Sequence, residues 1–185
     1  TPRGDAAARA ALMEELRRWG KVYGCDVLAL QECESSEPYT ELLARYELAG
    51  VAEAPETRGW VHVYVRRGLS YTRVAQGAVP CVALRIDAAV GDAESEAVVL
   101  ASVHLPVGDC SAKRRCMLEQ ILQSCHQLEE RVLVVGDLNA KDDEIRGICQ
   151  DLGLQDARYA GASWGVRGNG FYKDTGYIGP GMRKD

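Results

Sequence analysis

Three short apolar runs, each followed closely by polar residues, constrain the fold of this chain most strongly. The runs cover residues 26–32, 98–104 and 131–135, and they deliver Gln31-Glu32, Ser102-Val103-His104 and Asp137-Leu138-Asn139. Short and nearly continuous apolar runs are typical of strands buried inside a sheet. Catalytic groups tend to lie in the loops where such core strands end. We therefore expect these polar groups to act together.

The rest of the chain shows the periodicities of helices and of further strands. Helices are predicted over residues 6–23, 39–46, 112–130 and 142–152. Further strands are predicted over residues 60–66, 71–76 and 81–87. Asp5 and Ser111 can cap the first and the third of these helices.

Strands and helices alternate in blocks, which predicts an α/β fold in which sheets pack face to face with helices outside. The short connections from residue 71 to residue 104 indicate an antiparallel meander. The strand over residues 60–66 is expected to be half buried, with its valines on one face and His62 and Tyr64 on the other. A length of 185 residues, 46% of them hydrophobic, predicts one domain over residues 1–185.

The net charge of −5 argues against a protein that coats nucleic acid through a broad basic face. A local basic rim stays open, although short basic runs are more often solvated surface. The basic clusters are Arg66-Arg67, Lys113-Arg114-Arg115 and Arg183-Lys184.

Seven cysteines form no Cys-x-x-Cys pair, and several fall within apolar periodic segments where a thiol packs as a small hydrophobe. We therefore expect reduced thiols and an intracellular protein, without a structural zinc site. No apolar run approaches the roughly 20 residues that span a bilayer, so no membrane span is expected.

The polar groups at the strand ends suit Mg²⁺, which takes one or two carboxylates and completes its octahedron with water and phosphate oxygens. Glu32 would hold the ion, and Asp137 would deprotonate an attacking water. Asn139, two residues from Asp137 and on the same face of a strand, would position water or phosphate, and His104 would donate to a phosphoryl oxygen.

Each of these residues also has a structural interpretation. Glu32 could cap the following loop, and Asp137 with Asn139 could close an Asx-turn before the next helix. His104 could be a core histidine whose hydrogen bonds are satisfied. The ordered combination favours the functional interpretation.

The motifs DVLALQE (residues 26–32), SVHL (102–105) and VVGDLNA (134–140) resemble the ordered motifs of the endonuclease/exonuclease/phosphatase superfamily. Ser163-Trp164 resembles a short Thr/Ser-Trp element found later in many members. The resemblance implies a four-layer α/β/β/α sandwich of two mainly antiparallel sheets. It also implies cleavage of phosphodiesters or phosphomonoesters with Mg²⁺ or Mn²⁺.

By this resemblance, Glu32 matches the metal-binding Glu, His104 the phosphate-contacting His, and Asp137 and Asn139 the catalytic pair. Asp185 matches the Asp before the strand that orients the final catalytic His. The superfamily opens with a strand bearing a metal-site Asn and closes with a Ser-Asp-His motif, and these 185 residues contain neither. We expect a sandwich incomplete at both ends, with weak or no activity by itself.

A phosphodiesterase acting on nucleic acid is the first functional hypothesis, because the SxHL and GDLNA layout resembles the branch of tyrosyl-DNA phosphodiesterase and its nuclease relatives. Enzymes acting on inositol phosphates or sphingolipids share the same core, and the acidic net charge does not favour DNA over these small esters. A non-catalytic scaffold that retains the fold is a third hypothesis. We expect the protein to be a monomer.

Overall fold

The computed structural model describes residues 6–22, 24–57, 59–74, 79–87, 96–126 and 131–155. The chain forms two compact units, Thr1–Asn139 and Ala140–Asp185. The elements of the first are α1 (Ala6–Val22), β1 (Val27–Cys33), η1 (Thr40–Leu42), β2 (Tyr46–Ala54), β3 (Gly59–Arg66), β4 (Tyr71–Arg73), β5 (Cys81–Ile86), β6 (Val98–His104), α2 (Ser111–His126) and β7 (Arg131–Asp137). The expectation of one domain over residues 1–185 stays a prediction.

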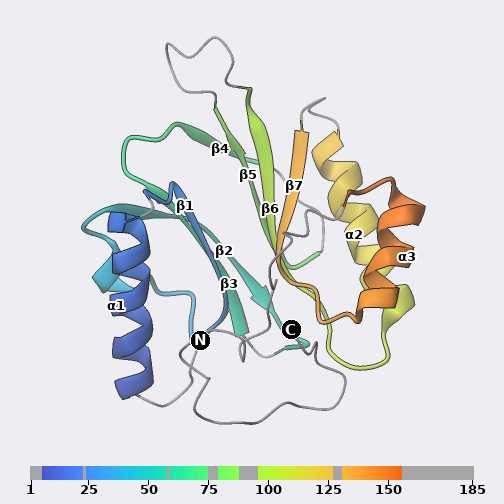
Figure 1. The fold of residues 1–185 in the computed structure, drawn as a ribbon, viewed down its shortest axis with the longest axis horizontal. Helices are drawn as coiled ribbons and strands as arrows, with labels where there is room; N and C mark the ends of the chain where they lie inside the picture. The colour runs from blue at the N-terminus through green and yellow to red at the C-terminus, as the bar shows by residue number, and fades with distance from the viewer. Residues whose placement is uncertain are drawn as a thin grey trace. The chain divides into compact units, whose positions relative to one another are not determined.

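The described strands of the first unit form two sheets (Figure 1). Sheet A has the order β1-β3-β2 and is antiparallel throughout. Sheet B has the order β4-β5-β6-β7, in which the first three strands are antiparallel and β7 runs parallel to β6. The predicted meander is therefore confirmed, and α2 supplies the crossover that a parallel neighbour requires.

The two sheets pack face to face through an aliphatic core. At Gly50 of β2 the sheets approach closely, because a Cβ atom there would lie 2.5 Å from Cγ1 of Val82 in β5. The buried residues of this core, Ala49, Val61, Val63 and Val65 from sheet A and Val82, Leu84, Ile86 and Leu100 from sheet B, belong to one cluster. Valine-rich alternation along each strand supplies the matching inner faces.

Helices cover the outer faces of both sheets, which confirms the predicted four-layer α/β/β/α sandwich. Met13 and Leu16 of α1 pack with Leu28 of β1 and Tyr64 of β3 in a second buried cluster on sheet A. On the other side, α2 contacts β7 and buries Leu118, Ile121, Leu122 and Cys125. The helical spacing of these apolar residues is what turns one face of each helix to its sheet.

Residues 39–46 do not form the predicted helix. The segment contains only the 3₁₀ turn η1, and β2 begins at Tyr46. At the start of this segment, the backbone N–H of Tyr39 donates a hydrogen bond to the hydroxyl of Tyr64 in β3 (2.8 Å). Only Tyr46, the last residue of the predicted helix, pairs with β3, and β2 then continues to Ala54.

The strand predicted over residues 60–66 is confirmed as β3, and its valines and Tyr64 belong to different core clusters, as the alternation predicted. The expected half burial is wrong, because β3 is buried on both faces. As the centre of sheet A it has sheet B on one side and the α1 layer on the other. His62 and Tyr64, expected on an open face, are both 0% exposed. Their polar atoms therefore need partners inside the protein.

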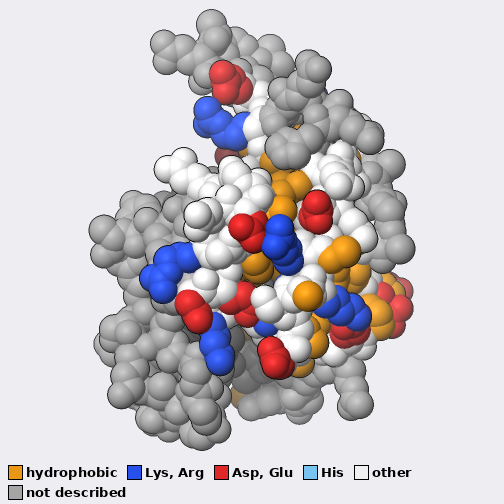
Figure 2. All heavy atoms as spheres, turned by 90° about the vertical axis from the view of Figure 1, so that its right-hand side faces the viewer, with side chains coloured by type: hydrophobic (Ala, Val, Ile, Leu, Met, Phe, Trp, Pro, Cys, Tyr) orange, Lys and Arg blue, Asp and Glu red, His pale blue; other side chains and the backbone are white. Residues whose placement is uncertain are grey.

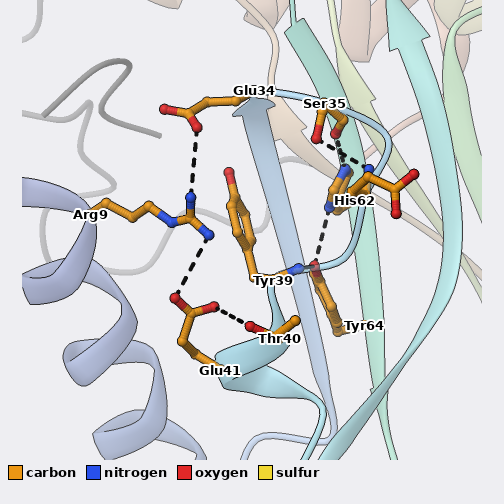
Figure 3. Close-up of polar contacts among 9 residues, drawn as sticks. Arg9, Glu34, Ser35, Tyr39, Thr40, Glu41, His62 and Tyr64 are labelled. Carbon is orange, nitrogen blue, oxygen red and sulfur yellow. Dashed lines mark hydrogen bonds and ion pairs between the residues drawn. The ribbon is translucent and has the colours of Figure 1, made fainter. Parts of the chain in front are cut away.

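A directional chain of hydrogen bonds supplies those partners (Figure 3). The carbonyl of Ser35 can only accept, so His62 donates to it from Nε2 (2.7 Å). The hydroxyl of Tyr64 already accepts from the N–H of Tyr39, so it donates its own proton to Nδ1 of His62 (3.2 Å). The network thus holds His62 as a neutral Nε2–H tautomer and pins the loop that follows β1.

Arg9 of α1 reaches the same loop from the other side (Figure 3). Its guanidinium lies 4.9 Å from the ring centroid of Tyr39. It also approaches the carboxylates of Glu34 (3.8 Å) and Glu41 (3.7 Å). These contacts join α1 to the segment between β1 and β2.

His62 makes stability depend on pH. Burial lowers the pKa of His62 below its ordinary value of 6.5, against the hydrogen bond to Ser35, which raises it. Between these two pKa values the unfolded chain binds the extra proton, so the free energy of unfolding falls as the pH drops below about 6.5, by at most about 1.4 kcal/mol per pH unit. Urea unfolding at about pH 7.5 and about pH 5.5 measures this loss.

His62→Gln should reduce the loss between these two pH values, because the substituted side chain does not titrate. His104 and His126 are present in both proteins and cancel in the comparison. An equal loss of stability in the variant and the parent chain would show that His62 is not the group responsible.

In the second unit, the described residues form α3 (Asp142–Leu152), as the sequence predicted. Its last turn closes at Gly153, which adopts the left-handed conformation (φ 65°). The N–H of Leu154 then donates to the carbonyl of Cys149 (2.8 Å), as in a typical helix end. Among the described residues, no helix is long and apolar enough to cross a membrane.

Candidate functional site

The parallel strands β6 and β7 end side by side, and each ends on a predicted site residue. His104 is the last residue of β6 and Asp137 the last of β7, and the two are paired in register. The carboxyl ends of parallel strands meet at one edge of a sheet, where ligands of open α/β sheets bind. The structure therefore brings His104 and Asp137 together at one edge of sheet B.

Gly136 permits this close approach. Its φ is 123°, a conformation that side chains disfavour. A Cβ atom at this position would lie 2.1 Å from the carbonyl oxygen of Val103 in β6. The glycine before Asp137 is thus required by the backbone of the neighbouring strand.

Gly136→Ala should destabilise the protein by about 2 kcal/mol or more, because both the strained φ and the clash with backbone resist relief. Gly147→Ala is the matched control, since a Cβ on α3 meets nothing within 4 Å. That change should be neutral or stabilise by up to about 1 kcal/mol. Thermal or urea unfolding measures both, and equal stability of the two variants would refute the steric argument.

A tight turn follows β7 and fixes Asn139. Oδ1 of Asp137 accepts the backbone N–H of Asn139 (2.9 Å), which makes the Asx-turn that the sequence left open. Leu105, the residue after His104, donates its N–H to the carbonyl of Asp137. The carbonyl of Leu105 accepts a hydrogen bond from Nδ2 of Asn139 (2.8 Å). The motifs SVHL and VVGDLNA are thus joined by hydrogen bonds.

The expectation that strand alternation places Asp137 and Asn139 on one face is wrong. The strand β7 ends at Asp137, and Asn139 has a left-handed backbone (φ 48°). Asparagine tolerates this conformation better than most residues. The Asx-turn, and not the pleat of a strand, sets the position of Asn139.

Glu32 lies at an irregularity of β1. The register of β1 on β3 shifts between Leu30 and Cys33, and Glu32 adopts a positive φ of 57°. Glu32 and Asn139 are the two non-glycine residues with positive φ in the described part of the chain. A bulge of this kind re-aims a side chain, and the carboxylate of Glu32 is exposed while Cys33 is buried.

Gln31 connects this strand end to sheet B. Its Nε2 donates to Oγ of Ser102 in β6 (3.2 Å), two residues before His104. The strand β1 also contacts both β6 and β7. All three polar strand ends predicted from the sequence therefore belong to neighbouring strands of the first unit.

His104 is 2% exposed and has a partner that sequence reasoning missed. Its Nδ1 lies 2.8 Å from the hydroxyl of Thr57, in the turn between β2 and β3. The alternation of residues 46–54 followed by Pro55 could have indicated a strand and a turn here. The helix-favouring residues in that stretch obscured the signal.

The basic clusters engage partners within the first unit. Arg66 pairs with Asp26 (2.7 Å), and Arg67 donates to the carbonyl of Leu43 (3.0 Å). Lys113 pairs with Glu56 (2.7 Å). Arg114 is 3% exposed and donates to the carbonyls of Pro106 and Gly108 at 2.8 Å, which orders the loop after His104. Arg183 and Lys184 lie outside the described residues.

The side chains of Glu32, Asp137 and Asn139 offer oxygen atoms that can act as hard metal ligands. Among the described residues, no three or more His, Cys, Asp or Glu side chains lie close enough together to bind one metal ion. A site based on the exposed carboxylate of Glu32 suits Mg²⁺, which keeps several waters and takes few protein ligands. Asp185 and Ser163-Trp164, the other expected motif residues, lie outside the described residues.

The family model described as the Endonuclease/Exonuclease/phosphatase family matches residues 2–183. The chain belongs to this family. The match includes all three strand-end motifs and both compact units. No curated protein matches the chain by sequence.

Several solved structures share the fold. A crystal structure of TDP2 from C. elegans has 16% sequence identity and a TM-score of 0.53, and the match covers 76% of this chain and 46% of that one. A humanized D. rerio TDP2 carrying 14 mutations has 17% identity and a TM-score of 0.52, with 83% and 63% of the two chains covered. The chain therefore spans about half to two thirds of the length of these proteins.

Proposed function

We propose that this chain carries residues of a metal-dependent phosphoesterase site that hydrolyses a phosphodiester at a nucleic-acid end. The observation that supports this best is the junction of β6 and β7, where His104 and Asp137 end in register and Asn139 is bonded back to Leu105. Membership of the Endonuclease/Exonuclease/phosphatase family supports the reaction class.

In this proposal Asp137 acts on the attacking water. Its Oδ1 accepts the N–H of Asn139, so the carboxylate is held in place and Oδ2 is the oxygen that takes the proton of the water. The water oxygen forms a bond to phosphorus as the ester P–O bond breaks. Nδ2 of Asn139 is oriented by Leu105, which leaves its Oδ1 to align the water.

Glu32 would hold a divalent cation, Mg²⁺ or Mn²⁺, beside these groups. When bound, such an ion polarises the phosphoryl oxygen and stabilises charge on the leaving oxygen. In support, the hydrogen bond from Gln31 to Ser102 ties the residue before Glu32 to β6, two residues before His104. His104 would donate a hydrogen bond to a phosphoryl oxygen.

One finding supports a nucleic-acid end as the substrate. The solved structures with this fold include TDP2 proteins, in keeping with the tyrosyl-DNA phosphodiesterase branch that the motifs resemble. Figure 2 shows one side of the molecule, on which Lys and Arg are interspersed with Asp and Glu among the side chains drawn in colour.

The test is hydrolysis of DNA, RNA, 5′-tyrosyl DNA, inositol phosphates and sphingomyelin by this chain, and by any longer product of its gene, with Mg²⁺ or EDTA. Asp137→Asn keeps an acceptor for the N–H of Asn139 but cannot take a proton. It should lower the rate about 10²- to 10⁴-fold. Glu119→Gln, an exposed change on α2, is the control and should leave the rate unchanged.

Cleavage of a nucleic-acid substrate that requires the metal and is lost in Asp137→Asn supports the proposal. Cleavage of inositol phosphates or sphingomyelin alone would keep the reaction class and replace the substrate. Activity in EDTA, or full activity of Asp137→Asn, would contradict the mechanism. No cleavage of any substrate by any of these proteins would favour a non-catalytic scaffold.

A further inference from the structure

A buried arginine holds the loop that leads from His104 to α2. Arg114 lies in the first turn of α2 and is 3% exposed. Its Nη1 donates to the carbonyls of Pro106 and Gly108, both at 2.8 Å. Burial and the helix dipole both disfavour a cation at this position, and charge-assisted hydrogen bonds to carbonyls help to offset that cost. Arg114 therefore contributes to the interior of the protein and not to a basic rim.

Pro106 transmits this contact to Leu105. The N–H of Leu105 is fixed by its hydrogen bond to the carbonyl of Asp137 (2.9 Å). The direction of its carbonyl, however, depends on the peptide plane that Leu105 shares with Pro106. The proline ring locks φ of Pro106, so this plane and the carbonyl of Pro106 differ by a single free torsion, ψ. Because Arg114 holds the carbonyl of Pro106, it also restrains the carbonyl of Leu105.

The carbonyl of Leu105 in turn binds the side chain of Asn139. It accepts a hydrogen bond from Nδ2 of Asn139 (2.8 Å), and Leu105 is 0% exposed. The backbone of Asn139 is fixed separately, because its N–H donates to Oδ1 of Asp137 (2.9 Å). The last torsion of an asparagine side chain has a broad preference of its own, so the hydrogen bond to Leu105 sets how the amide is turned. A continuous series of contacts thus joins Arg114 to the amide of Asn139.

We propose that Arg114 is a positioning residue that acts through the Leu105–Pro106 peptide to fix the orientation of the Asn139 side-chain amide. The catalytic consequence rests on the proposed function, in which Oδ1 of Asn139 aligns the attacking water. The restraint on the amide rests only on the hydrogen bonds of Arg114, Leu105 and Asn139. The two parts can therefore be tested separately.

Exchange of the Asn139 side-chain amide protons with water, measured by NMR, tests the restraint without any substrate. Asn139→Asp identifies these signals by their loss. Arg114→Met replaces the guanidinium by an unbranched apolar side chain and should speed exchange of the bonded proton about 3- to 10-fold. Arg114→Lys keeps the charge without the fork of N–H groups and should give an intermediate rate. Arg115→Met is the matched control, because Arg115 is the neighbouring exposed arginine on α2, and it should leave the rate unchanged.

An exchange rate in folded Arg114→Met equal to that of the parent chain would overturn the proposal, as would an equal increase in Arg115→Met. The backbone amide spectrum shows whether each variant folds. If Arg114→Met does not fold, Arg114→Lys decides, and a rate equal to that of the parent chain in this variant would overturn the proposal.

Kinetics test the catalytic part in whichever protein, this chain or a longer product of its gene, hydrolyses a substrate. Arg114→Met should lower kcat about 3- to 10-fold with little change in KM, because Asn139 acts on the water and not on the bound ester. In Asn139→Ala the same change should have little further effect, since Arg114 acts through Asn139. An equal further loss in Asn139→Ala would overturn this role. Faster amide exchange of Arg114→Met in a protein that hydrolyses no substrate would support the restraint and remove the proposed function.

Discussion

The parallel register of β6 and β7 is the constraint on which the rest of the site depends. It places His104 beside Asp137, and it exists because Gly136 lets β7 approach the carbonyl of Val103 more closely than any side chain allows. Leu105 and Asn139 then join the loops that follow the two strands. The crossover helix α2 makes this pairing parallel, while most other described neighbours in the sandwich are antiparallel.

Backbone strain in the described part of the chain coincides with the residues that the motifs single out. Glu32 and Asn139 both adopt positive φ, at a cost that the surrounding contacts must offset. For Asn139 these contacts are the Asx-turn and the carbonyl of Leu105. For Glu32 they are the pairing of β1 with β3 on either side of the irregularity, the Gln31–Ser102 hydrogen bond and the loop pinned by His62. Strain of this kind supports a functional interpretation of both positions.

The sequence predicted β1, β6 and β7 from their short apolar runs, and β6 is buried over nearly all its length. The expectation that residues 131–135 form a buried strand is wrong, because β7 has no buried residue and Leu133 is 42% exposed. The sequence also predicted α1, α2 and α3 from helical spacing. It failed at residues 39–46, where the hydrogen bond from the N–H of Tyr39 to the hydroxyl of Tyr64 joins residues 25 positions apart, and it missed β2, which pairs with β3. It assigned an open face to His62 because sheet stacking is not local information. The contact of Thr57 with His104 joins residues 47 positions apart, and no local pattern encodes it.

The central claim is that the ends of β1, β6 and β7 form one cation-dependent phosphoesterase site. Titration of ¹⁵N-labelled protein with Mn²⁺ tests it most directly, because the paramagnetic ion broadens nearby amide signals. The account predicts that the amides of Glu32, His104 and Asp137 broaden first, and that Glu32→Gln weakens this effect while Glu119→Gln does not. Broadening centred elsewhere, or unchanged in Glu32→Gln, would contradict the account.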